Sequence, residues 1–154
     1  MTKIVHPLAG ALAFLTIATF WLSTVFSELF GSQAVVTSVK TAIPWGFLLL
    51  VPALAAAGGS GFAMARERQG AALVALKMKR MRIIAANGIL VLIPSAFFLA
   101  SKAAAGEFDT TFYVVQALEL VAGATNIALL SLNMRDGLKL SGRLRHRPTS
   151  QTQS

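Results

Sequence analysis

Polar side chains recur inside a long, mainly apolar stretch near the end of the chain, between Thr111 and Met134. Gln116, Glu119 and Asn126 interrupt this stretch. At about 1.5 Å per residue, a helix over 111–134 would measure roughly 36 Å, which exceeds the ~30 Å hydrocarbon core of a bilayer. An ionisable side chain at such a depth is energetically costly and marks a candidate functional site. Glu119 is therefore the first candidate functional residue.

The polar residues of this stretch lie on one side of the expected helix. At about 100° per residue, one helical face carries Gln116, Glu119, Gly123, Asn126 and Asn133. We call this face the polar seam. It must meet other helices, because unsatisfied polar groups cost several kcal/mol in lipid. In an antiparallel arrangement Asn126 matches the depth of Asn87 on the preceding apolar run, so we expect a direct hydrogen bond between the two amides.

Two roles are open for Glu119. Trp21, Ser23 and Thr24 lie at about its depth on the first apolar run, whereas no Lys, Arg or His is expected there. Desolvation without a counter-ion favours the neutral acid. A neutral Glu119 would donate a hydrogen bond that joins helices. Alternatively, Glu119 would take up and release a proton, or coordinate a cation, during transport.

The composition defines the elements that must hold this seam. The chain has 154 residues, of which 55% are hydrophobic and 13% charged, and it has no cysteine. Apolar runs of about twenty residues are typical of membrane-spanning helices. They predict spans over residues 8–30, 42–65, 83–100 and 111–134. The expected fold class is all-α, a membrane-embedded, up-down-up-down four-helix bundle within residues 1–140.

Connections of different character are expected around these spans. Residues 31–40 would form a polar connection with some helical character, and residues 66–82 a basic loop with a short helix in the interface plane. Asp109 is expected to cap the N-terminus of the last helix. Residues 141–154 form a basic, Ser/Thr-rich tail that we expect to be disordered.

The net charge of +8 is distributed unevenly along the chain. All of the 14 Lys and Arg residues except Lys40 and Lys102 fall before the first span, in the 66–82 loop or after Met134. The positive-inside rule places these segments, and with them both termini, in the cytoplasm. Nucleic-acid binding is therefore not expected. Anionic lipid headgroups would instead meet the basic cluster of the loop, which contains Lys77, Lys79, Arg80 and Arg82.

His6 is the histidine closest to a span, because His146 lies in the tail. A chain without paired histidines cannot hold a bis-histidine haem within one protomer. A haem b bridged by His6 across a dimer, or held by His6 and Met64, is the alternative to an ordinary interfacial histidine. No other cofactor and no metal-ligand set is indicated. No HExxH, Walker A or Ser/His/Asp constellation predicts catalysis.

The end of the second span has almost no side-chain bulk between Ala55 and Gly61. The stretch closes with Gly58-Gly59-Ser60-Gly61. Small residues let a neighbouring helix approach closely, so close helix packing is the favoured explanation. A backbone site for a flat ligand is the alternative.

A family resemblance rests on several stretches: FWLSTVFSELFGS, GGSGF, IAANGILVLIP, GEFDTTFYVVQALELVAGATN and LNMRDGLKL. Together they resemble an uncharacterised family of small bacterial four-span inner-membrane proteins, over about residues 6 to 143. The resemblance implies the fold and the inner-membrane location and brings no activity or site residues. We therefore expect an integral membrane protein without an enzymatic site. It would be a homo-oligomer or a subunit of a larger membrane complex, or it would form a pathway for small solutes or protons.

Overall fold

The computed structural model describes residues 2–66 and 72–140, with side chains for residues 4–64 and 73–139. Every element within these ranges is helical. The elements are α1 (Thr2–Phe30), α2 (Gln33–Arg66), α3 (Ala72–Asn87), the π-helical turn η1 (Gly88–Leu92), α4 (Ile93–Ala104) and α5 (Thr110–Leu140). Because α3, η1 and α4 follow one another without a break, they form one helical segment. The prediction of an all-α four-helix bundle is confirmed.

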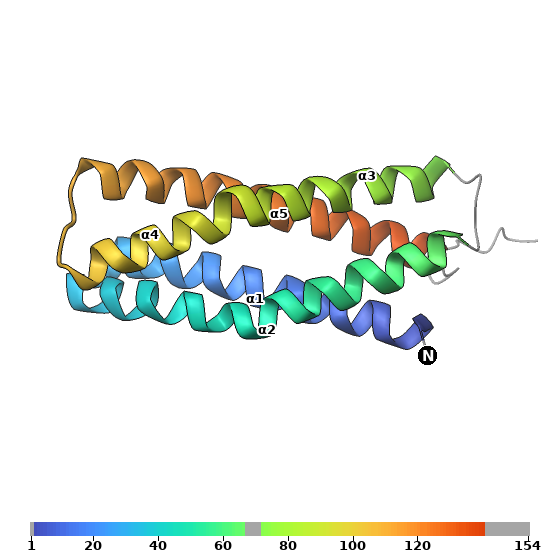
Figure 1. Cartoon of the computed structure of the whole chain (residues 1–154), viewed down its shortest axis with the longest axis horizontal. Coiled ribbons are helices and arrows are strands. Elements are labelled where there is room, and N and C mark those ends of the chain that lie inside the picture. Colours follow the sequence, from blue (N-terminus) through green and yellow to red (C-terminus); the bar gives the residue numbers. More distant parts are fainter. Residues whose placement is uncertain (1, 67–71, 141–154) are drawn as a thin grey trace, which may run out of the picture.

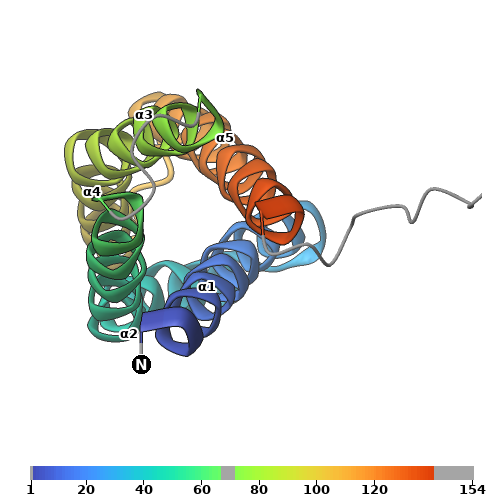
Figure 2. The ribbon, with the colours of Figure 1, turned by 90° about the vertical axis from the view of Figure 1, so that its right-hand side faces the viewer.

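The four helical segments run antiparallel along the long axis of the molecule (Figure 1). Seen end-on, they surround a central axis in the order α1, α2, α4 with α3, and α5 (Figure 2). The contacts agree, because α1 packs on α2 and α5, α4 packs mainly on α2, and α3 packs mainly on α5. We call the end with the N-terminus and the start of α3 the basic end. The opposite end, where α1 meets α2 and α4 meets α5, is the turn end.

The first turn is much shorter than the sequence predicts. Only Gly31 and Ser32 separate α1 from α2, so residues 33–40 belong to α2 and not to a polar connection. Glycine suits position 31, because a Cβ there would lie 2.5 Å from the carbonyl oxygen of Ser27. Helical hydrogen bonds satisfy the backbone more completely than a loop would. Polar side chains alone therefore do not delay the start of the helix.

The third segment is also longer than predicted. The sequence predicts a short span over 83–100 after a basic loop, whereas the helix already begins at Ala72 and continues to Ala104. The basic cluster at residues 77–82 therefore lies on the helix itself. In the same way α5 extends the predicted span 111–134 to Leu140. The remainder of the predicted loop, residues 67–71, and the tail 141–154 lie outside the described residues.

Residues 105–109 connect α4 to α5 at the turn end. Gly106 has a φ of +71°, in the left-handed region that closes many helices. Asp109 caps α5 as predicted, because its Oδ1 accepts a hydrogen bond from the backbone N–H of Phe112 at 2.9 Å. Its Oδ2 accepts a second hydrogen bond from Lys102 Nζ at 2.6 Å. One carboxylate thus joins the end of α4 to the start of α5.

This capping carboxylate predicts a specific pH dependence of stability. The hydrogen bond from Lys102, and that from Phe112, hold the pKa of Asp109 below its ordinary value. A pKa that is lowered in the folded state stabilises the fold at pH values above the ordinary aspartate pKa of about 4. This stability is lost as the pH falls through the lowered pKa. In Asp109→Asn the amide keeps the cap but does not titrate. Thermal unfolding should therefore show a stability advantage of the native chain near neutral pH that vanishes in acid. A difference independent of pH would contradict the assignment.

The distribution of side chains fits a bundle surrounded by lipid. Large apolar side chains point outward, and Trp45 (75% exposed), Leu48 and Leu90 are examples. The interior combines small or apolar residues with hydroxyl, amide and charged ones, as is typical of packing between membrane helices. Within the described ranges, the helices long and apolar enough to cross a membrane are Ile4–Phe30, Gln33–Met64, Leu73–Ala104 and Thr110–Lys139. The structure is thus compatible with a multi-pass membrane protein.

Candidate functional site

A buried ion pair joins α2 to α5 in the half of the bundle near the turn end. Lys40 Nζ donates to Glu119 Oε2 at 2.5 Å, and the two side chains are only 1% and 12% exposed. The expectation that no cation reaches the depth of Glu119 is therefore wrong. Lys40 is carried inside because α2 begins at Gln33 and presents this residue to the bundle interior. Glu119 therefore has the counter-ion whose expected absence favoured a neutral glutamic acid.

Other polar groups surround this pair, and we call Lys40, Glu119, Thr24 and Glu28 the turn-end cluster. Thr24 Oγ1 accepts a hydrogen bond from Lys40 Nζ at 3.4 Å, so the hydroxyl expected beside Glu119 contacts the lysine instead. Glu28 lies close enough to interact electrostatically with both Lys40 and Glu119. The cluster therefore holds two carboxylates and one ammonium group. One turn before Glu119, the amide of Gln116 is buried and has no hydrogen-bond partner among the described residues.

A pair of amides forms the middle of the polar seam. Asn87 Nδ2 donates to Asn126 Oδ1 at 2.9 Å, which is the contact expected from the sequence, and also to the carbonyl oxygen of Ala122 at 2.9 Å. Asn126 Nδ2 in turn donates to the carbonyl oxygen of Ile84 at 3.4 Å. Asn87 is the last residue before η1, and π-helical turns are frequently found at functional sites.

A second buried ion pair lies towards the basic end. Arg80 Nη1 donates to Asp136 Oδ2 at 2.6 Å, and the carboxylate is almost fully buried. Lys77 also turns inward, since its Nζ lies 3.3 Å from where a Cβ would stand on Gly137. Asn133, on the polar seam and buried, has no hydrogen-bond partner for either amide atom within the described residues. Two cationic side chains here face one carboxylate, the reverse of the turn-end cluster.

These contacts divide the basic cluster for which lipid headgroups were the expected partners. Lys77 and Arg80 face the bundle, whereas Lys79 and Arg82 are exposed. Headgroup binding therefore remains a prediction for the exposed pair. The inward pair instead extends the polar seam beyond Asn133.

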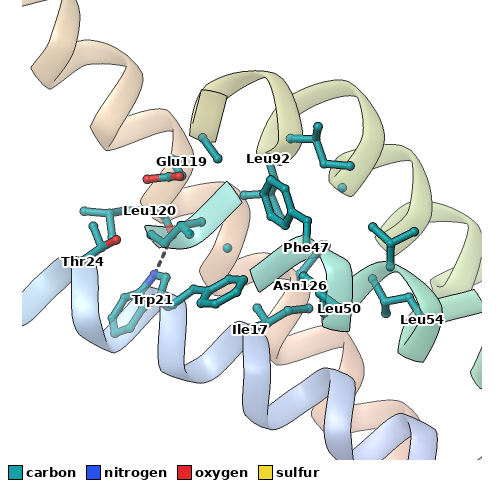
Figure 3. A pocket seen from close by; sticks show the side chains of 17 residues that line it. Ile17, Trp21, Thr24, Phe47, Leu50, Leu54, Leu92, Glu119, Leu120 and Asn126 are labelled. Atoms are coloured by element: carbon teal, nitrogen blue, oxygen red, sulfur yellow. Dashed lines mark hydrogen bonds between the residues drawn. The ribbon is translucent and has the colours of Figure 1, made fainter. Parts of the chain in front are cut away.

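A cavity of about 80 Å³ lies inside the bundle. It extends from the ion pair at Glu119 to the amide pair at Asn126, and we call these two pairs and the Arg80–Asp136 pair the three polar levels. Its lining is mostly apolar, and its polar members include Thr24, Glu119 and Asn126 (Figure 3). Trp21 forms one wall, and its Nε1 donates to the carbonyl oxygen of Leu120 at 2.9 Å. The ring lies against Gly123, where a Cβ would stand 3.0 Å from Trp21 Cδ1. The glycine of the polar seam therefore makes room for an aromatic side chain beside the cavity.

His6 lies near the basic end and joins α1 to α2. Its Nδ1 is 3.0 Å from the carbonyl oxygen of Ala57 and 3.2 Å from the hydroxyl of Ser60. The ring packs on Gly61, where a Cβ would lie 3.0 Å from Cε1. Met64 stands one turn beyond Ser60 on the same helix. These contacts explain His6 as a residue that pairs two helices, and no observation favours haem binding over this role.

Sequence reasoning misses several charged members of the site, among them Lys40 and Asp136. A signal for Lys40 exists, because Val36, Lys40 and Ile43 follow the helical spacing of four and three residues and all three are buried. Asp136 follows Asn133 by three residues and so continues the polar seam past the predicted end of the span. Both residues lie just where a hydropathy profile places a helix end.

Comparison with models of protein families, with curated proteins and with solved structures finds no match for this chain. The fold and the site nevertheless define a class of protein. The molecule is a four-helix bundle compatible with an integral membrane protein, and its interior carries an ion pair, an amide pair and a second ion pair in succession.

Proposed function

We propose that this chain forms a pathway for protons or small solutes across a bacterial inner membrane, with both termini in the cytoplasm. The orientation follows from the positive-inside rule applied to the basic end. The observation that carries the pathway is the succession of buried polar levels along α5. Glu119, Asn126 and Asp136 each pair with a residue of another helix.

The chemistry of the three levels suits proton movement. A buried carboxylate beside an ammonium group can accept a proton and release its partner, and ionisable residues inside membranes commonly form such relays. In the turn-end cluster, Glu28 offers Lys40 a second carboxylate when Glu119 is protonated. The amides of Gln116 and Asn133, which have no hydrogen-bond partner in the described part of the chain, lie on the same face of α5 as Glu119 and Asn126. Buried polar groups of this kind commonly bind ordered water, which would connect the levels.

The cavity supports the first step of this pathway. It borders Glu119 at one end and Asn126 at the other, residues that are seven positions and therefore roughly 10 Å apart along the helix. A cavity of about 80 Å³ is larger than the ~30 Å³ share of one water molecule in the liquid. Water or a small solute held there would bridge the ion pair to the amide pair.

Proteoliposomes containing the purified chain test the proposal. An imposed pH gradient, followed with a pH-sensitive dye, should collapse at least about tenfold faster with the native chain than with Glu119→Gln, because the amide cannot carry the proton. Glu107→Gln is the matched control, since Glu107 is an exposed acid at the turn end. Its flux should equal that of the native chain. If folded Glu119→Gln supports the native flux, the titrating role of Glu119 is wrong.

A role as a subunit of a larger membrane complex is the second form of this proposal. The buried pairs would then mainly hold the bundle in one arrangement, and the exposed apolar faces would meet partner helices. The same flux measurement separates the two forms, because a passive subunit gives no flux that depends on Glu119.

A further inference from the structure

A groove separates α2 from α3 towards the basic end of the bundle. Its volume is about 260 Å³, and it is bordered by Gly58 and Phe62 on α2 and by Met78, Met81, Arg82 and Ala85 on α3. The two helices touch only sparsely. The volume exceeds the ~150 Å³ cavity that accommodates a benzene ring in a protein core. An elongated apolar group could therefore lie between the helices.

The groove exists because Gly58 of α2 is only sparsely covered by α3. A Cβ on Gly58 would meet only the Met81 Cε, at 3.9 Å, and a Cβ on Gly59 would meet nothing within 4 Å. Gly61 alone of these glycines is closely covered, by the ring of His6. The close helix packing predicted from this stretch therefore does not occur at Gly58. What remains is an apolar channel with Gly58 in its lining.

The charge at the groove identifies its occupant. Arg82 is the charged residue of the lining, and it is exposed. Side chains on a helix lean towards its N-terminus, which for α3 is the basic end, and arginine extends its guanidinium towards the membrane surface. Guanidinium binds phosphate through paired hydrogen bonds. An apolar channel that leads inward from such an arginine matches an acyl chain attached to a phosphate.

We propose that this groove binds one anionic phospholipid, with an acyl chain along Gly58 and Ala85 and the phosphate at Arg82. The site is independent of the proposed pathway, since it lies outside the polar seam and shares none of its charged pairs. Lys79, exposed one turn before Arg82, adds a second positive charge near the headgroup.

Native mass spectrometry of the full chain in a mild detergent tests the site. Phosphatidylglycerol and phosphatidylcholine with identical acyl chains would be titrated separately. We expect one phosphatidylglycerol to be retained, at least about tenfold more tightly than phosphatidylcholine. Arg82→Gln should reduce this preference to within about twofold, and Lys139→Gln, a change of an exposed basic residue on α5 at the same end, should leave it intact.

Filling the channel supplies the second arm of the test. Gly58→Leu should abolish the retained lipid, whereas Gly59→Leu, whose side chain enters open space, should retain it. Ala85→Leu fills the channel from α3 and replaces Gly58→Leu if that variant fails to fold by circular dichroism. Retention of the lipid in folded Gly58→Leu or Ala85→Leu would overturn the proposal. So would equal affinity of the native chain for the two lipids, or gradual binding of several equivalent ones.

Discussion

Replacing Lys40 by methionine is expected to lower the free energy of unfolding by about 3 to 5 kcal/mol, the usual cost of removing one partner of a buried ion pair. Methionine fills a similar volume, so the loss comes from charge and not from a cavity. The change leaves Glu119 and Glu28 without the ammonium group that faces both. Glu119→Gln should cost less, about half as much, because Lys40 then keeps Glu28 as a counter-ion. Lysine is thus the more critical member of the turn-end cluster.

Equilibrium unfolding in mixed micelles measures these differences. The double variant Lys40→Met/Glu119→Gln should recover most of the stability lost in Lys40→Met, since it removes the uncompensated carboxylate of Glu119. Lys79→Met is the matched control, because Lys79 is exposed, and its stability should match that of the native chain. Equal losses for Lys40→Met and for the double variant would show that the pair does not act as a unit.

Asp136→Asn is expected to destabilise the chain by roughly 1.5 to 3 kcal/mol, the value of a hydrogen bond to a charged group. The ratio of charges at this end is opposite to that of the turn-end cluster, where two carboxylates share one cation. Asp136 is the carboxylate that faces both Arg80 and Lys77. Arg80→Gln should therefore cost only about half as much, because Lys77 remains near the carboxylate.

The same unfolding measurement checks this second asymmetry. Lys79→Gln provides the control, since Lys79 is exposed on the same helix as Arg80, and its effect should be small. A larger loss for Arg80→Gln than for Asp136→Asn would contradict the assignment of two cations to one acid.

The contact between Asn87 and Asn126 could be predicted because it depends only on the depth of each residue in the bundle and on the helical face that carries it. In an antiparallel bundle, counting residues from the same end gives the level of each side chain, and helical periodicity gives the face. Both quantities are properties of the local sequence. The polar seam from Gln116 to Asn133 could be recognised for the same reason.

The ion pairs could not be predicted in this way. Lys40 and Glu119 are 79 positions apart, and Arg80 and Asp136 are 56 apart. A hydropathy profile scores each charge as if it stood alone, whereas the cost of burying it depends on a partner brought in by the tertiary fold. Isolated lysine and aspartate therefore mark helix ends in the profile, although in the folded chain they lie inside the bundle.

The glycines of α2 show a related limit. Composition indicates that a surface is smooth, but it does not say which neighbour covers it. His6 occupies the surface at Gly61, while Gly58 borders the groove towards α3 and a Cβ on Gly59 would enter open space. Close packing on this stretch is therefore found against α1 at Gly61 and is not found at Gly58 and Gly59 among the described residues.

The π-helical turn η1 changes which face of the helical segment α3–η1–α4 is buried. Before it, Arg80, Ile84 and Asn87 direct their contacts at α5. Continued at 3.6 residues per turn, this face would reach positions near 91, 94, 98 and 102. The buried positions beyond η1 are instead Ser95, Ala96, Leu99 and Ala103, about one residue later. The wide turn absorbs that residue and shifts the helical phase by about 100°. On a single unbroken helix, a polar contact surface for α5 is thus followed by Leu99 and Ala103, which pack with Val36 of α2 and Phe112 of α5.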